Sequence, residues 1–219
     1  MNITVNSVNL YYEVSGKGKP IILLHGNRET HKVFDKLIER LSENYKVYAI
    51  DSRCHGKSEN SKGISYELMR DDVICFIREL KLEKPILYGF SDGGIVGLLI
   101  TIKAPELLSK LIVSGPNLYP GGMKDSMLRY SKIGYFLTKN KLFKLMLEEP
   151  NISFEELRRI KISTVILVGE RDIVKLEHTK LIADNIENSV LEIIKGEGHG
   201  SYIVHQDKIY SIIKKYLEV

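Results

Sequence analysis

Tryptophan is absent from this 219-residue sequence, cysteine occurs twice and proline six times. Cys54 and Cys75 show no C-x-x-C spacing and are too few for a metal cluster, so we expect two free thiols and no metal site. No apolar run approaches the roughly 18 residues that a membrane span requires. The opening residues 1–14 also lack the basic segment and the apolar run of a signal peptide. These absences predict a cytoplasmic protein without a membrane span.

A large excess of one charge is also missing. The sequence contains 32 lysine and arginine residues and 28 aspartate and glutamate residues, which gives a net charge of +4. The two signs are interspersed, and no basic run is dense enough to follow a phosphate backbone, so nucleic acid is not expected as a partner. The hydrophobic fraction of 43% and the charged fraction of 27% are close to globular averages. Length and composition together predict one folded domain, residues 1–219.

Short β-rich runs alternate with amphipathic segments along most of the chain. An opening hairpin and six further runs read as strands, at residues 3–14, 20–26, 46–52, 85–91, 110–116, 164–170 and 190–199. Between or after them, apolar residues recur with helical spacing at residues 31–43, 66–80 and 207–219. Several strand candidates are continuously apolar, as strands covered on both faces must be. The pattern predicts an α/β fold with a mostly parallel sheet of roughly eight strands and helices on both faces.

Residues 117–160 interrupt this alternation, because they contain no convincing strand. A Pro-Gly-Gly turn at residues 120–122 opens a helical, lysine-rich stretch. Flexible and aromatic apolar side chains gather there: Met123, Met127, Met146, Tyr130, Tyr135, Phe136 and Phe143. Methionine suits a surface that must repack around varied apolar groups, so the segment predicts a short helical lid over a substrate. The alternative is that these residues only seat the insertion on the core, and both can hold for different residues.

The stretch "YGFSDGGIVG" places Ser91 between an apolar strand and an apolar helix. A sharp strand-to-helix turn holds its serine at an unfavourable backbone angle, and Gly89 and Gly93 remove collisions on either side. The turn directs the backbone N–H of Asp92 and the positive end of the helix dipole toward an atom reacting at Ser91, so an oxyanion would be stabilised there. A phosphate-binding loop is disfavoured, because neither G-x-x-x-x-G-K-[ST] nor an opening G-x-G-x-x-G is present.

A reactive serine needs a base, and the base needs an orienting carboxylate. Asp172 follows one apolar strand candidate, and His199 follows the next, between two glycines. The carboxyl ends of parallel strands share one edge of a sheet, so these residues can meet Ser91. The other candidates are weaker: Glu170 lies too close to its strand and Asp184 lies on a helix. We expect the remaining histidines outside the glycine loops to lie at the surface, namely His31, His178 and His205.

Two further stretches, "LLHGN" at residues 23–27 and "DSRCHGKS" at residues 51–58, follow successive strand candidates. With the turn at Ser91 and the order Ser91, Asp172, His199, they make the whole chain resemble the α/β-hydrolase fold superfamily, in its serine hydrolase branch. The resemblance implies that the backbone N–H of Asn27 joins that of Asp92 in an oxyanion hole.

The sequence also departs from the family pattern. Cys54 occupies a position that is usually glycine in the D-x-R-G-x-G-x-S turn, so this turn either keeps angles that a cysteine tolerates or bends differently. Asn27 and Arg28 stand where many relatives carry an aromatic or small residue. Arg28 pairs with a substrate carboxylate if it faces the site, and is a solvated charge if it faces outward. His25 is expected to be a structural partner of its loop rather than a base.

The resemblance implies a carboxylesterase-like enzyme that cleaves a small ester or thioester through an acyl-enzyme on Ser91. It implies a small-molecule acyl substrate and no metal or organic cofactor. A serine at this turn argues against dehalogenase and epoxide-hydrolase relatives, which carry an aspartate there. Three alternatives stay open: a C–C bond hydrolase or an acyltransferase with the same triad, and a non-catalytic ligand-binding protein on the same fold.

Overall fold

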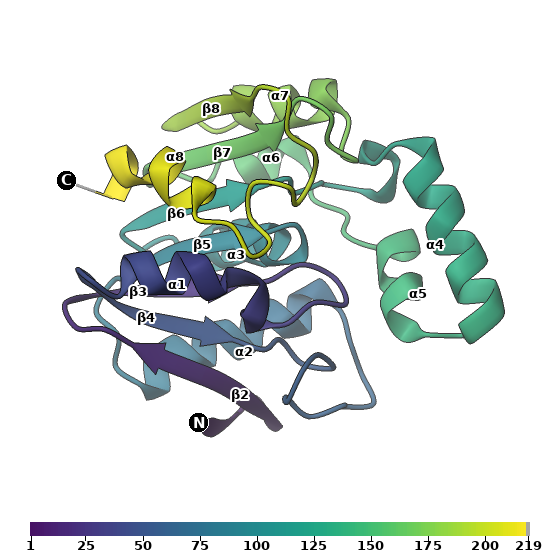
Figure 1. Cartoon of the computed structure of the whole chain (residues 1–219). Helices are drawn as coiled ribbons and strands as arrows, with labels where there is room; N and C mark the ends of the chain where they lie inside the picture. Colours follow the sequence, from purple (N-terminus) through teal and green to yellow (C-terminus); the bar gives the residue numbers. More distant parts are fainter. Residues whose placement is uncertain (218–219) are drawn as a thin grey trace.

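A computed structural model describes residues 1–217 of the chain, and its central element is an eight-stranded sheet of order β1-β2-β4-β3-β5-β6-β7-β8 (Figure 1). The first two strands pair antiparallel and β2 joins β4 antiparallel, whereas all the other pairings are parallel. The predicted mostly parallel sheet of eight strands is therefore confirmed. Its strands are β1 (Asn2–Val5), β2 (Val8–Ser15), β3 (Lys19–Leu24), β4 (Tyr45–Ile50), β5 (Ile86–Phe90), β6 (Lys110–Ser114), β7 (Thr164–Gly169) and β8 (Ser189–Ile194).

Helices cover both faces of the sheet. Those that pack against it or extend from it are η1 (His31–Phe34), α1 (Asp35–Leu41), α2 (Tyr66–Glu79), α3 (Asp92–Lys103), η2 (Pro120–Gly122), α4 (Asp125–Thr138), α5 (Lys141–Glu148), α6 (Phe154–Leu157), α7 (Leu176–Asp184) and α8 (Lys208–Leu217). In Figure 1, α1 and α8 lie in front of the sheet, while α2 and α3 lie behind it. The predicted helix layers on both faces are confirmed.

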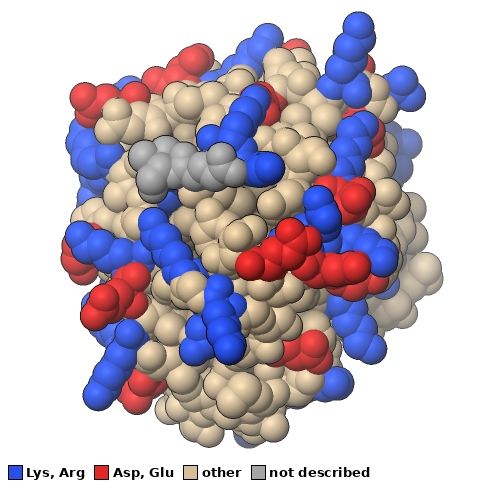
Figure 2. Space-filling model, turned by 60° about the vertical axis from the view of Figure 1, so that its left-hand side comes forward, with Lys and Arg blue, Asp and Glu red and all other residues tan. Residues whose placement is uncertain are grey.

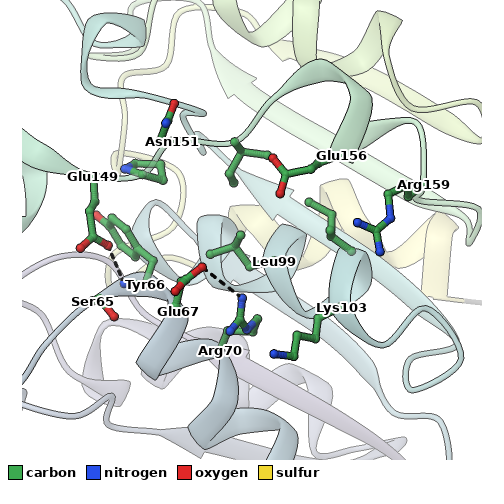
Figure 3. A pocket seen from close by; sticks show the side chains of 13 residues that line it. Ser65, Tyr66, Glu67, Arg70, Leu99, Lys103, Glu149, Asn151, Glu156 and Arg159 are labelled. Carbon is green, nitrogen blue, oxygen red and sulfur yellow. Dashed lines mark hydrogen bonds and ion pairs between the residues drawn. The ribbon is translucent and has the colours of Figure 1, made fainter.

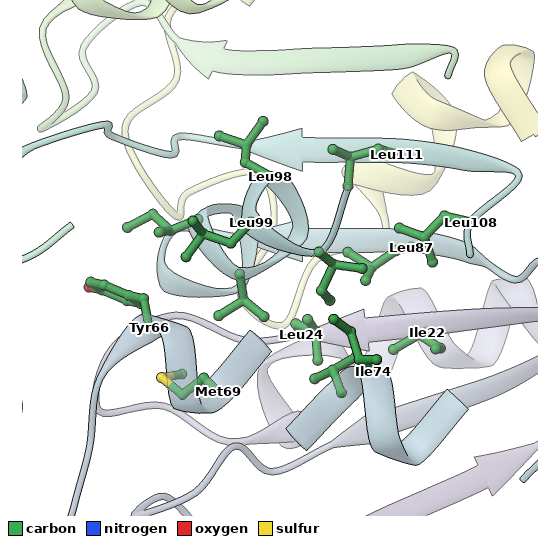
Figure 4. Packing of buried hydrophobic residues seen from close by; sticks show 14 of the residues in the cluster. Ile22, Leu24, Tyr66, Met69, Ile74, Leu87, Leu98, Leu99, Leu108 and Leu111 are labelled. Atoms are coloured by element: carbon green, nitrogen blue, oxygen red, sulfur yellow. The ribbon is translucent and has the colours of Figure 1, made fainter. Parts of the chain in front are cut away.

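The core divides into two clusters because successive residues of a strand point to opposite faces. In β3, Ile22 and Leu24 belong to the cluster beneath α2 and α3, and Ile21 and Leu23 belong to the cluster beneath α1 and α8. Figure 4 shows Ile22 and Leu24 packed with side chains of the first cluster. Because helices cover both faces of the sheet, side chains on both sides of this strand are buried, which explains its continuous apolar run.

The segment between β6 and β7 contains η2, α4, α5 and α6, and α4 with α5 forms a helical hairpin beyond the sheet, at the right of Figure 1. The first helix of the hairpin ends at Thr138, and the next residue, Lys139, adopts a left-handed φ of 53°. The second begins at Lys141 and is capped by Asn140, whose side chain accepts a hydrogen bond from the N–H of Leu142. An ideal Cβ on Gly134 would lie 2.5 Å from the Phe143 ring, so glycine permits the two helices to approach closely.

Charged side chains of both signs share the surface. On the face turned forward in Figure 2, lysine and arginine side chains stand among aspartates and glutamates. Several ion pairs join residues three positions apart, such as Lys36 with Glu39 at 3.2 Å and Arg40 with Glu43 at 3.3 Å. Within the described part of the chain, no helix has the length and apolar character needed to cross a membrane.

Candidate active site

Ser91 lies on the turn between β5 and α3, with φ 52° and ψ −113°. This backbone conformation is unfavourable for a residue with a side chain, and the surrounding structure must hold it. An ideal Cβ on Gly89 would lie 2.2 Å from the carbonyl oxygen of Gly93, and one on Gly93 would lie 2.1 Å from that of Leu24. The two glycines therefore allow a turn that any larger residue would obstruct.

The loops after β7 and β8 bring Asp172 and His199 to Ser91. The Nε2 atom of His199 lies 2.9 Å from the Ser91 hydroxyl, and its Nδ1 atom lies 2.6 Å from Oδ1 of Asp172. The three side chains thus form one hydrogen-bonded series, although His199 is 108 residues from Ser91 and 27 from Asp172. A parallel sheet makes this possible, because the carboxyl ends of its strands share an edge.

The environment of Asp172 favours its ionised form. Burial alone raises the pKa of Asp172, but hydrogen bonds from His199 and from the N–H groups of Val174 and Gly169 outweigh it and lower this pKa below its usual value. An ionised carboxylate keeps the proton of His199 on Nδ1 and leaves Nε2 free to accept the hydroxyl proton of Ser91. The arrangement can therefore convert Ser91 into a nucleophile.

The backbone N–H groups of Asn27 and Asp92 are the predicted oxyanion donors. Among residues 1–217, neither N–H donates a hydrogen bond. Asp92 is the first residue of α3, where helical N–H groups have no partner within the helix. The loop that carries Asn27 also lies against the nucleophile, since an ideal Cβ on Gly26 would be 3.2 Å from Cβ of Ser91. Both N–H groups are thus without an acceptor in the described part of the chain, as oxyanion donors would have to be.

The side chain of Asp92 connects the two predicted donors. It is 3% exposed, and its carboxylate accepts hydrogen bonds from Nδ2 of Asn27 and from the hydroxyl of Tyr66, both at 2.8 Å. Burial raises the pKa of Asp92, and these two bonds oppose the shift only in part. Sequence reasoning did not identify Tyr66. The apolar sequence of the helix that Asp92 opens indicates that this carboxylate needs hydrogen-bond donors, but it does not indicate which residue supplies them.

A cavity of about 220 Å³ opens beside Ser91 and His199. Its remaining lining residues come from the loop after β3, from β5, from the α4–α5 hairpin and from the loop after β7: Gly26, Asn27, Arg28, Glu29, Phe90, Met127, Tyr130, Phe143, Met146 and Ile173. Of the apolar residues predicted for a lid, Met127, Tyr130, Phe143 and Met146 line this cavity. Met123 instead lines a small adjoining hollow, and Tyr135 and Phe136 line neither.

Arg28 lines the cavity, and its side chain remains exposed. Its Nη1 atom donates to the hydroxyl of Tyr130 at 3.1 Å, and its guanidinium lies 4.5 Å above the centre of the Phe143 ring. The sequence left open whether Arg28 faces the site or the solvent, and in the structure its side chain borders the cavity and is also exposed to solvent. Glu29 was not predicted as a site residue. It accepts the N–H of Gly26 at 3.0 Å, and burial raises the pKa of its carboxyl.

A larger cavity of about 510 Å³ lies where α2 and α3 meet the chain around Glu149 and α6 (Figure 3). Its charged lining residues are equally divided in sign: Glu67, Glu149, Glu156, Arg70, Lys103 and Arg159. Tyr66 and Glu149 also line the small hollow next to Ser91. Ser91 and His199 do not line the larger cavity, so size alone does not identify the site.

Two histidines differ from the prediction that they lie at the surface. His31 is 3% exposed and its Nδ1 atom lies 2.7 Å from Asp51, while His178 is 4% exposed and its Nε2 atom accepts the N–H of Leu118 at 2.9 Å. The prediction was wrong because hydrogen-bonding partners remote in sequence permit their burial. His205 is exposed.

His25 is buried within its loop. Its Nε2 atom accepts the N–H of Ser52 at 3.0 Å, and its Nδ1 atom lies 2.8 Å from the Gly26 carbonyl. Burial, with the nearby His55, lowers the pKa of His25 to about 4, so the ring is neutral at physiological pH. This geometry gives His25 the structural role expected from the sequence.

The turn at residues 51–58 retains a glycine-like conformation at Cys54, whose φ is 65°. The cysteine therefore occupies the left-handed region rather than bending the turn differently. Asp51 organises the turn by accepting the N–H groups of Lys57 at 2.9 Å and His31 at 2.8 Å. Burial raises the pKa of Asp51, but these hydrogen bonds and the His31 side chain outweigh it and lower the pKa overall. Within residues 1–217, no group of three or more His, Cys, Asp or Glu side chains forms a candidate metal site.

Comparisons with known proteins agree with this geometry. Residues 19–141 match the family model described as alpha/beta hydrolase fold. The chain is 29% identical to "AB hydrolase superfamily protein YisY" from Bacillus subtilis, with 97% of each chain covered. It is 28% identical to a "Putative esterase/lipase" from Haemophilus influenzae, covering 90% of this chain and 82% of that one. The solved structure of bromoperoxidase from Bacillus anthracis is similar in fold, with a TM-score of 0.87, 22% identity and 100% of both chains covered.

Proposed function

Since the chain belongs to the alpha/beta hydrolase fold family, we propose that it is a serine hydrolase that cleaves a small ester or thioester through an acyl-enzyme on Ser91. The observation that carries this proposal is the position of His199, 2.9 Å from the Ser91 hydroxyl and 2.6 Å from Asp172. Relatives named as hydrolase and esterase/lipase, similar along most of the chain, support the same class of reaction.

In the proposed reaction, Ser91 Oγ attacks the substrate carbonyl while Nε2 of His199 takes the hydroxyl proton. The carbonyl oxygen becomes an oxyanion and binds the N–H groups of Asn27 and Asp92. His199 then returns the proton to the leaving alcohol or thiol as the tetrahedral intermediate collapses to the acyl-enzyme. Water, deprotonated by His199, then adds to the acyl carbonyl, and the bond to Ser91 Oγ breaks as Oγ takes the proton back from His199, which releases the carboxylic acid. Throughout, Asp172 stabilises the imidazolium and keeps His199 oriented.

The cavity favours a small acyl or alcohol group. Its volume of about 220 Å³ lies below the range of roughly 300 to 1,000 Å³ that is usual for pockets that hold drug-sized ligands. Aromatic and thioether side chains of the α4–α5 hairpin form one wall, which suits an apolar group, and in this proposal the hairpin acts as the lid. Arg28 lies at the exposed side of the cavity, where it can contact an anionic end of a substrate.

Labelling with a fluorophosphonate probe, followed by peptide mapping, tests the nucleophile. Wild-type protein should be labelled at Ser91, and Ser91→Ala and His199→Ala should abolish labelling. Ester turnover should fall by about 10⁶ in either variant. Ser201→Ala is a matched control, because Ser201 lies two residues from His199, is exposed and hydrogen-bonds only outside the triad. Retained turnover in Ser91→Ala would refute the proposal, and folded wild-type protein without labelling would favour a ligand-binding role.

A further inference from the structure

The outer face of α4 exposes large apolar side chains. Of the nine large hydrophobic residues that are exposed in the described chain, four belong to this helix. Tyr130 is 53% exposed, Ile133 54%, Phe136 73% and Leu137 71%. With about 100° of rotation per residue, they share one stripe roughly 120° wide along the helix. We call these four residues the α4 apolar stripe.

Packing of the hairpin accounts in part for Tyr130, whose ring lies 5.7 Å from that of Phe143 on α5, but not for Ile133, Phe136 and Leu137. The inner side of α4 meets α5 where Gly134 lies against the Phe143 ring and where Ser131 is fully buried. In Figure 1, α4 is the outermost element at this end of the molecule, so the face opposite α5 is turned away from the sheet. Apolar groups of this size are normally covered when they lie side by side on one element.

The same part of the chain is rich in positive charge. Residues 129–144 contain no aspartate or glutamate, and five basic residues: Arg129, Lys132, Lys139, Lys141 and Lys144. Lys144 pairs with Glu148 and Lys141 contacts the carbonyl of Ser61, whereas Arg129, Lys132 and Lys139 form no ion pair within residues 1–217. Lys139 lies 5.3 Å from the centre of the Phe136 ring, beside the stripe. The acidic residue of α4, Asp125, lies in its first turn and pairs with Lys175 at 3.8 Å, away from this basic stretch.

We propose that the α4 apolar stripe and its flanking cations dock on an anionic lipid surface. A helix with bulky apolar side chains on one side and basic residues at its flank is suited to lie in a membrane interface, where the apolar groups enter the lipid and the cations meet phosphates. Charge complementarity selects this occupant over a second copy of the chain. Two such faces brought together would place their unpaired cations against one another without acidic partners.

Docking in this orientation would bring the Ser91 cavity close to the lipid. Tyr130 belongs both to the stripe and to the lining of that cavity, and Met127 lines the cavity from the same helix. The surface would therefore place the proposed hydrolase beside esters held in the lipid. Binding itself does not depend on the chemistry of Ser91, so it can be measured whether or not the proposed reaction occurs.

Sedimentation with phosphatidylcholine vesicles, with and without phosphatidylglycerol, tests the proposal. The protein should bind the anionic vesicles, bind neutral ones weakly, and dissociate as salt is raised. Phe136→Ser/Leu137→Ser should weaken anionic-vesicle binding by about tenfold or more. Lys132→Gln/Lys139→Gln should weaken it by about fivefold per lysine.

Matched controls use exposed residues on and around the edge strand β8 and on α7. Val190→Ser/Ile193→Ser removes two apolar residues that are 47% and 43% exposed on β8, and Lys180→Gln/Lys195→Gln removes two exposed lysines. Both should bind like wild type. Absence of binding to anionic vesicles, or equal losses in control and α4 variants, would overturn the proposal. So would a dimer in lipid-free solution that Phe136→Ser/Leu137→Ser dissociates, because it would assign the face to a second copy. Turnover of a water-soluble ester, measured in parallel, should be unchanged in these variants.

Discussion

Tyr66→Phe removes one of the two hydrogen-bond donors of a buried carboxylate. The Tyr66 hydroxyl lies 2.8 Å from Oδ1 of Asp92, and Asn27 supplies the other donor. A hydrogen bond to a charged group contributes about 1.5 to 3 kcal/mol, and its loss leaves the carboxylate partly unsatisfied. The substitution should therefore lower the free energy of unfolding at neutral pH by about 2 kcal/mol.

This loss should depend on pH. Burial already places the pKa of Asp92 above its ordinary value of 3.8, so the folded protein binds a proton that the unfolded chain has released. Stability therefore falls as pH rises from the unfolded-state pKa through the folded-state pKa. Removing the Tyr66 hydroxyl raises the folded-state pKa further. The difference between wild type and Tyr66→Phe should be small below pH 3.8, where the carboxyl is neutral in both states, and should grow as the pH rises through the folded-state pKa of Asp92.

Urea unfolding of both proteins across this pH range measures the effect. Tyr88→Phe is the control, because the buried hydroxyl of Tyr88 lies 3.0 Å from the neutral Ser114 hydroxyl. Tyr88→Phe should lower the free energy of unfolding by about 1 kcal/mol at every pH. Ester turnover in Tyr66→Phe should fall by about tenfold, less than the 10² to 10³ that follows loss of an entire oxyanion donor, since the Asp92 N–H is displaced but still present. Equal, pH-independent losses in the two phenylalanine variants would refute this account of Asp92.

Gly93→Ala should prevent folding or lower the free energy of unfolding by more than about 3 kcal/mol, because the new Cβ would lie 2.1 Å from a carbonyl oxygen. Gly121→Ala, whose Cβ would have its nearest atom at 3.4 Å, should be tolerated, and thermal unfolding of the two variants compares them. In urea unfolding, Asp72→Asn should lower the free energy of unfolding by about 3 to 5 kcal/mol, since it leaves the Arg53 guanidinium buried without its carboxylate partner. The double variant Arg53→Met/Asp72→Leu removes both charges and should recover much of that loss. Asp51→Asn should lower the free energy of unfolding at neutral pH, and this loss should shrink as the pH falls below about 3.8. The reason is that the pKa of Asp51 is lowered in the folded protein, so its ionised carboxylate stabilises the fold above that pH and is protonated below it. A loss that does not depend on pH would contradict this.

The sequence predicted best those features that are encoded by neighbouring residues. Continuous apolar runs followed by glycine-flanked polar residues located the strands and the loops at Ser91, Asp172 and His199. Chain order and the shared edge of a parallel sheet then brought these three residues together, without any knowledge of their distances. The hairpin of β1 and β2 is local in the same sense, because Asn6 and Ser7 both adopt the positive φ angles of a tight two-residue turn.

Contacts between remote residues were beyond this reasoning. Tyr66 reaches Asp92 across 26 positions and Asn27 reaches it across 65, and no spacing in the sequence pairs them. His178 was misplaced for the same reason, since the N–H that it accepts belongs to Leu118, 60 positions away. In each case a buried polar group is stabilised by partners remote in sequence, and their identity depends on the packing of elements whose relative positions only the folded chain defines.

Helical periodicity has a related limit, because it shows which residues share a face and does not show what covers that face. Phe76 on α2 and Phe136 on α4 both belong to apolar stripes, yet the first is fully buried and the second is 73% exposed. The apolar stripe of α2 packs on the sheet and is buried there. On α4 the inner side packs on α5, so the remaining apolar residues have no cover from residues 1–217. Unpaired cations beside those residues make an anionic lipid surface the partner whose chemistry matches the exposed face.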